Sequence, residues 1–226
     1  VSDRDLEHVV ALYRGEIAWV DEQVGRVLDE LRANGRLERT LIVVASDHGE
    51  EFFEHGLRGH KLTLYDVSLR VPLLIVLPQA LRRSTPAAVA AQVSLSDVLP
   101  TILDYAGIEP PRTVFGRSLR PALEGRAFDS RPEVSSLTLF THPEGGERLV
   151  VVNEAVRTPT YKLLRHTALR PGQEPQMTLV YTDLVASPDE QLRAVDSPEN
   201  MAPHAPVREA WEALEGQLER MRAIHA

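Results

Sequence analysis

Two apolar runs that enclose a highly charged segment constrain the fold of this chain more than any other feature. Residues 41–45 and 73–77 are β-branched and aliphatic, which is typical of strands covered on both faces in a parallel sheet. Asp47 and His48 directly follow the first run, where open α/β sheets bind their ligands. The carboxylates, imidazoles and lysine between the runs cannot all be buried unpaired, so the segment predicts a metal or polyanion site.

Asp47, His48 and Lys61 supply the chemistry that such a site needs. An aspartate offers a hard oxygen suited to Ca²⁺, Mg²⁺ or Mn²⁺, and a histidine offers a nitrogen that transition metals also accept. Lys61 precedes the second run and can reach the same crevice, where its ammonium would neutralise an oxyanion bound to the metal. Gly49 is expected to let the backbone turn sharply after the pair. An adjacent Asp-His pair alone is a weak signal, because such pairs are common in loops.

The composition limits the class of protein. With 226 residues, an apolar fraction of 43% and a charged fraction of 26%, the chain can form one sizeable globular domain with a small appendage. A net charge of −8 argues against a nucleic-acid binder, and no apolar run approaches the roughly 20 residues of a membrane span. The chain has no cysteine, so we expect no disulfide. It opens without methionine and without a visible signal peptide, and its localisation stays unassigned.

Periodicity and turn residues predict the remaining elements. Apolar residues at three- and four-residue steps predict a helix over residues 3–31 that lies on the sheet. Ser96 is expected to cap a second helix that ends at Gly107. Short β-prone segments from residue 134 onward predict a small antiparallel sheet, and a C-terminal helix follows. The apolar stripe of this last helix consists of Val207, Trp211, Leu214, Leu218 and Met221.

The fold class that these elements predict is α/β, with a partial, mostly parallel sheet flanked by helices. A small antiparallel sheet with a C-terminal helix completes it. We place the boundary between residues 1–131, the α/β part, and residues 132–226, the small α+β subdomain. A partial sheet exposes a broad apolar face, so we expect self-association or poor solubility unless a partner covers that face.

Several motifs in this order resemble the second half of the sulfatases, which belong to the alkaline-phosphatase superfamily. The resemblance extends over essentially the whole chain, including the helix before the first strand and the segments after residue 134. The motifs that carry it are SDHGE at 46–50, EHG at 54–56, KLTLYD at 61–66, LRVPL at 69–73 and GRSL at 116–119.

The resemblance implies a role for each matching residue. Asp47 and His48 would be ligands of a divalent ion, usually Ca²⁺, with Mn²⁺ or Mg²⁺ as alternatives. Lys61 would contact the sulfate and assist the leaving group. His60 would be a second contact to the ester oxygen, and the competing interpretation is an exposed loop histidine.

Three further residues are expected to support the site and not to touch substrate. Glu54 and His55 would brace the loop. Arg70 would be a structural ion-pair partner, with Asp66 as the candidate partner.

The sequence departs from the sulfatase pattern at the nucleophile. The family carries a Cys/Ser-x-Pro-x-Arg motif, converted to formylglycine, together with an early pair of aspartates that completes the metal site. This chain has no cysteine, and no serine with both the proline and the arginine at that spacing. We therefore expect these 226 residues to be the C-terminal portion of a sulfatase-like hydrolase of sulfate esters, incapable of turnover alone.

Two other readings stay open. One is a phosphonate or phosphate monoester hydrolase of the same superfamily, since these esters share the tetrahedral oxyanion of sulfate. The other is a non-catalytic module that binds a partner or oligomerises, which the missing nucleophile would favour.

Overall fold

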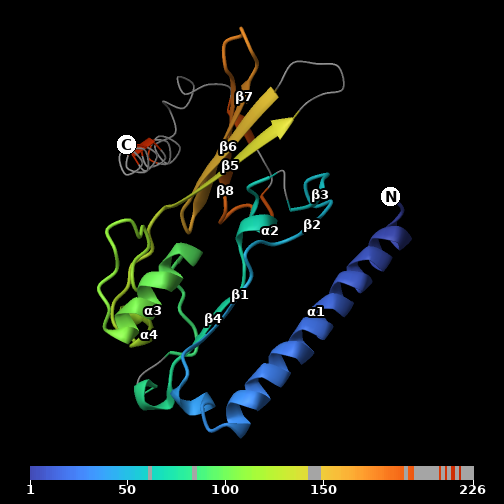
Figure 1. Cartoon of the computed structure of the whole chain (residues 1–226). Helices are drawn as coiled ribbons and strands as arrows, with labels where there is room; N and C mark the ends of the chain where they lie inside the picture. The colour runs from blue at the N-terminus through green and yellow to red at the C-terminus, as the bar shows by residue number, and fades with distance from the viewer. Residues whose placement is uncertain are drawn as a thin grey trace.

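The computed structural model describes residues 1–60, 63–82, 86–141, 149–190 and 193–195, and five positions between 209 and 219. Its first half contains three longer elements: the helix α1 (Asp3–Ala33), the strand pair β1 (Ile42–Ala45) and β4 (Leu73–Val76), and the helix α3 (Val98–Ala106). Its second half is an antiparallel sheet, which lies above the β1–β4 pair in Figure 1. No helix in the described part is both long and apolar enough to cross a bilayer.

The helix α1 forms where its periodicity predicts it. Ser2 and Asp5 form a capping box at its start, and Asn34 caps its end. The expectation that this helix packs on the sheet is wrong, because none of its residues is buried. Figure 1 shows α1 standing to one side of the β1–β4 pair. Its aromatic contact is between Tyr13 and Phe52, whose ring centroids lie 5.1 Å apart.

The strands β1 and β4 pair antiparallel, which corrects the prediction of a mostly parallel sheet. A parallel pair needs a crossover, usually a helix that runs back along the sheet. The segment between these strands instead holds a small hairpin of β2 (Glu51–Phe52) and β3 (Arg58–Gly59), and the four-residue helix α2 (Asp66–Leu69). Without a crossover helix the chain returns in the opposite direction. The mixed α/β class with a following antiparallel sheet is confirmed.

The helix α3 is fixed to the rest of the chain through a buried aspartate. Ser94, and not Ser96 as the sequence suggested, caps the short 3-10 turn Leu95–Asp97 that leads into α3. Asp97 is fully buried and accepts hydrogen bonds from the backbone N–H groups of Ser94 and Arg117. A Cβ on Gly116 would lie 1.8 Å from the carbonyl oxygen of Ser96. The GRSL motif is therefore a packing motif, in which glycine allows the close approach and Arg117 supplies the N–H.

The second half is a five-stranded meander in the order β5-β6-β7-β8-β9, with every neighbouring pair antiparallel. The predicted antiparallel sheet is confirmed, and β9 is an addition that the sequence did not indicate. Its core includes Val156, Leu163 and Leu179, all fully buried. The strands are β5 (Glu133–Thr141), β6 (Leu149–Arg157), β7 (Tyr161–Leu169), β8 (Gln176–Asp183) and β9 (Arg193–Val195).

The structure describes only part of the predicted C-terminal helix. Positions 209, 212, 215, 216 and 219 are helical, whereas the five stripe residues lie outside the described residues. The division at residues 131 and 132 stays a prediction.

Four charged side chains join α2 to the antiparallel sheet. Asp66 of α2 lies 2.8 Å from Nη2 of Arg157 and 2.9 Å from Nζ of Lys162. Lys162, only 1% exposed, also lies 2.8 Å from Oε1 of Glu190. The backbone N–H of Asp66 donates to the other carboxylate oxygen of Glu190. Because all four are paired, the buried charges hold α2 firmly beneath the sheet.

Candidate functional site

The loop after β1 is fixed against α2 by a glycine. The N–H of Gly49 donates to the carbonyl of Ser68 at 2.8 Å, and a Cβ at Gly49 would lie 1.9 Å from the carbonyl oxygen of Val67. Gly49 is thus required by the close approach of two backbones, a different reason from the sharp turn that the sequence suggested. The two residues before it are held at a defined place at the end of β1.

Asp47 and His48 present two donor atoms to the same point. Nδ1 of His48 lies 2.9 Å from the carbonyl oxygen of Gly49, and since a carbonyl only accepts, Nδ1 carries the proton and Nε2 a lone pair. Nε2 lies 3.6 Å from Oδ2 of Asp47, whose side chain is 88% exposed. Two ligands at right angles on an ion with bonds of about 2.3–2.6 Å lie roughly 3.3–3.7 Å apart. The pair therefore fits a shared divalent cation.

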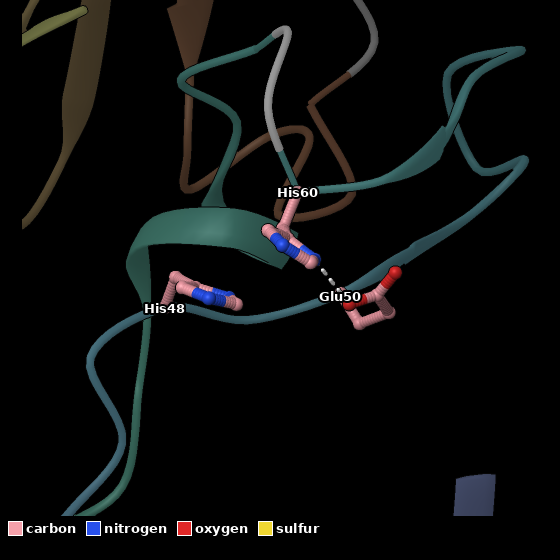
Figure 2. A group of neighbouring side chains, drawn as sticks. All are labelled: His48, Glu50 and His60. Atoms are coloured by element: carbon pink, nitrogen blue, oxygen red, sulfur yellow. Dashed lines mark hydrogen bonds and ion pairs between the residues drawn. The ribbon is translucent and has the colours of Figure 1, made fainter.

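His60 lies beside this pair. Its ring stacks on that of His48, with centroids 4.0 Å apart and planes 18° from parallel. Its Nδ1 lies 2.8 Å from Oε2 of Glu50, as Figure 2 shows. One donor atom from each of His48, Glu50 and His60 lies within 4.8 Å of the others. Of the four predicted site residues, Asp47 and His60 both lie next to His48. Lys61, the fourth, lies outside the described residues.

Asp47 and His48 also line a pocket of about 780 Å³. Its walls come from the α/β part and from the antiparallel sheet, which contributes Arg157 among others. Arg70 lines this pocket too and is exposed. The expected pairing of Arg70 with Asp66 is wrong, because Asp66 pairs with residues of the sheet.

A buried glutamate organises the hairpin between the two strands. Glu51, 2% exposed, accepts a hydrogen bond from the backbone N–H of His55, whose ring stacks on Tyr65 at 3.8 Å. Glu54 accepts the backbone N–H of Phe52. His55 and Glu54 therefore brace the loop as the sequence suggested. Glu51 was not singled out, because a buried glutamate and an exposed one look alike in sequence.

Asp66 and Tyr65, which lie next to the site, have pKa values shifted by burial and by neighbouring charges. Burial pushes the pKa of Asp66 upward most strongly, but hydrogen bonds and charge from Arg157 and Lys162 outweigh it, so the pKa lies below its ordinary value. Burial raises the pKa of Tyr65, and the negative charges of Glu190 and Glu51 add to the effect. At neutral pH, the residues beneath the site are therefore an ionised, paired Asp66 carboxylate and a neutral Tyr65 phenol.

Comparison with known families identifies the segment that carries this site. The family model described as Sulfatase matches residues 2–108, which include β1, the Asp47-His48 loop, α2 and β4. This part of the chain is similar to the sulfatase family. The N-acetylglucosamine-6-O-sulfatase of Bacteroides thetaiotaomicron is 34% identical to the chain over 155 residues, covering 67% of this chain and 27% of that protein.

Two solved structures are similar to nearly the whole chain, including the antiparallel sheet. BT4656, solved in complex with its substrate D-glucosamine-2-N,6-O-disulfate, is 27% identical with a TM-score of 0.64, over 92% of this chain and 40% of that one. The phosphonate monoester hydrolase of Silicibacter pomeroyi is 28% identical with a TM-score of 0.72, over 98% of this chain and 42% of that one. The chain thus spans less than half the length of either protein.

Proposed function

We propose that this chain forms the carboxyl-terminal part of a sulfatase-like, metal-dependent hydrolase of sulfate esters. The observation that carries the proposal is the 3.6 Å separation of the Asp47 and His48 donors, at a pocket, within the segment that matches the sulfatases. These two residues would hold the divalent ion, with Ca²⁺ as the first choice and Mn²⁺ or Mg²⁺ as alternatives. When bound, the ion would stabilise the negative charge that develops on the ester oxygens.

The remaining residues of the chain would bind and orient the ester. Glu50 accepts a hydrogen bond from Nδ1 of His60, which fixes the ring. A proton on Nε2 as well would let this nitrogen donate to the ester oxygen. Lys61 would contact the sulfate and neutralise charge on the leaving group. The antiparallel sheet would close the pocket on the side of Arg157.

The chain does not hold all the groups that turnover needs. Ca²⁺ takes six to eight oxygen ligands, and Asp47 and His48 supply two of the donors. The formylglycine nucleophile, its arginine and the other carboxylates would come from a part of the polypeptide beyond these 226 residues. We therefore expect no hydrolysis of sulfate esters by this chain alone.

A phosphonate or phosphate monoester hydrolase is the second candidate. The similarity to the Silicibacter pomeroyi phosphonate monoester hydrolase favours it, and that protein is as similar to this chain as BT4656 is. A non-catalytic partner-binding or oligomerising module is the third candidate. The exposed apolar side chains of α1 and of the β1–β4 pair favour it.

The test is a comparison of esters with the longest polypeptide that contains this chain. Sequencing the coding region upstream of Val1 identifies the nucleophile motif, and the complete protein is then assayed with an aryl sulfate and an aryl phosphonate. We expect the sulfate to be preferred. Asp47→Asn and Lys61→Ala should each lower kcat/KM at least about a hundredfold.

The matched control is His166→Ala, which lies on β7 away from the pocket and should leave kcat/KM unchanged. A preference for the phosphonate would select the second candidate. Absence of hydrolysis of either ester by a folded, metal-loaded protein would select the third.

A further inference from the structure

We propose that His48, Glu50 and His60 form a binding site for a divalent transition-metal ion, such as Zn²⁺ or Co²⁺, within this chain. The site shares His48 with the cation pair described above but uses Glu50 and His60 in place of Asp47. It needs no residue from outside the described part of the chain.

The three side chains converge from two segments of the loop. Figure 2 shows His48 and Glu50, from the stretch between β1 and β2, and His60, which follows β3, turned toward a common point. One donor atom of each lies within 4.8 Å of the other two, and Nδ1 of His60 lies 2.8 Å from Oε2 of Glu50. Tetrahedral donors on Zn²⁺, with bonds of about 2.0–2.1 Å, lie roughly 3.4 Å apart. Changes of up to about 1.4 Å in these separations therefore close the group around an ion.

All three side chains are partly exposed to solvent. Their exposed fractions are 43% for His48, 34% for His60 and 24% for Glu50. The two imidazole rings are stacked, so their in-plane lone pairs run side by side, and each ring has to turn toward the other for both lone pairs to meet at one ion.

The donor set selects the kind of metal. Two imidazole nitrogens and one carboxylate suit Zn²⁺, Co²⁺ or Fe²⁺, whereas Ca²⁺ and Mg²⁺ prefer sites made of oxygen atoms. Three protein ligands also leave coordination positions for water. The charge is suitable as well, because Glu50 supplies the one formal negative charge.

The surrounding hydrogen bonds already prepare one of the ligands, His48. A metal-binding histidine usually donates its second ring N–H to a carbonyl or carboxylate. Nδ1–H of His48 does this to the carbonyl of Gly49, and Gly49 is itself fixed by the carbonyl of Ser68. At His60 the ion would take the place of the proton between Nδ1 and Glu50, and that proton would move to Nε2.

The test is a titration of the complete 226-residue chain with CoCl₂, followed through the visible ligand-field absorption of bound Co²⁺. We expect one ion per chain, displaced by ZnCl₂ and not by CaCl₂ at the same concentration. Glu50→Gln and His60→Ala should each weaken Co²⁺ binding at least about tenfold. Glu50→Gln keeps the side-chain shape and an acceptor for His60, so the fold is retained, which circular dichroism checks.

His166→Ala is the matched control, because His166 is also a hydrogen-bonded histidine but lies on the antiparallel sheet. It should leave Co²⁺ binding unchanged. Unchanged binding in both Glu50→Gln and His60→Ala would overturn the proposal, as would a loss in Asp47→Asn alone. The measurement needs no turnover, so its outcome is independent of whether the complete protein hydrolyses sulfate esters.

Discussion

The helix α1 and the β1–β4 pair, together called the amino-terminal layer, differ from the antiparallel sheet in how much apolar surface they bury. No residue of α1 is buried, and on the strand pair Val44, Leu74 and Val76 are exposed. The antiparallel sheet instead buries Val156 and Leu163 completely. Because the hydrophobic contribution follows the apolar area removed from water, α1 should contribute little to the stability of this chain and the buried residues of the sheet much more. One face of the β1–β4 pair packs on a small core around Leu77, Leu119 and Leu123, whereas α1 buries no residue and the side chains of Val44, Leu74 and Val76 stay exposed.

The candidate metal pair and the ionic cluster at the sheet differ in how far their charged side chains are exposed. Asp47 in the layer is almost fully exposed, whereas Lys162 and Glu190 of the sheet region are buried and paired. Asp66 links the two regions, because it belongs to α2 and pairs with the sheet. The candidate site is therefore built on exposed loops that a buried ionic cluster holds in place.

The largest expected effect comes from breaking this cluster. Lys162→Met leaves the carboxylates of Asp66 and Glu190 without their shared ammonium, and should lower the free energy of unfolding by about 3–5 kcal/mol. Urea unfolding followed by circular dichroism measures it. Arg170→Ala, an exposed residue of the same region, is the control and should change it by less than about 0.5 kcal/mol. A change below about 1 kcal/mol for Lys162→Met would contradict the prediction.

Shortening one apolar side chain to alanine in each region tests the difference in burial directly. Leu163→Ala, in the sheet, should lower the free energy of unfolding by about 2–5 kcal/mol, because it removes a fully buried side chain. Ile17→Ala, on the exposed side of α1, should lower it by less than about 0.5 kcal/mol. Equal effects of the two substitutions in urea unfolding would show that α1 is covered in solution.

Acidification should weaken the link between the two regions. The pKa of Asp66 is lower in the folded chain than in the unfolded chain, so its ion pairs contribute stability above pH 4. That contribution is lost as the pH falls through the folded value, below the ordinary 3.8. Urea unfolding between pH 7 and pH 3 measures the loss. Asp66→Asn should flatten this part of the profile, and an unchanged profile would exclude Asp66 as the cause.

The smallest effect on folding is expected for the exposed face of the layer. Leu74→Ser combined with Ile17→Ser should change the free energy of unfolding by less than about 1 kcal/mol, because both side chains are already exposed. The same pair should reduce self-association of the chain, since it interrupts the apolar face. Light scattering at high concentration measures this. A monomer in both the original and the substituted chain would contradict the expected self-association.

Much of the local structure could be predicted because its causes are local. The three- and four-residue steps of α1 and the end of α3 at Gly107 depend on neighbouring residues alone. The short strands of the antiparallel sheet follow in the same way from β-prone runs and turns. The Asp47-His48 pair could be found because a strand and its polar end are adjacent in the chain.

The sequence alone determined where α1, α3 and most of the strands lie, and which residues carry the sulfatase motifs. Only the tertiary structure decided that β1 and β4 run antiparallel, that Glu50 and His48 meet His60, and that Asp66 pairs across the molecule. Arg70 is close to Asp66 in sequence, yet the partners of Asp66 are 91 and 96 residues away. The physical reason is that periodicity and capping act over a few residues. Pairing of charges instead depends on the path of the whole chain, which places Lys162 where burial makes a carboxylate partner necessary.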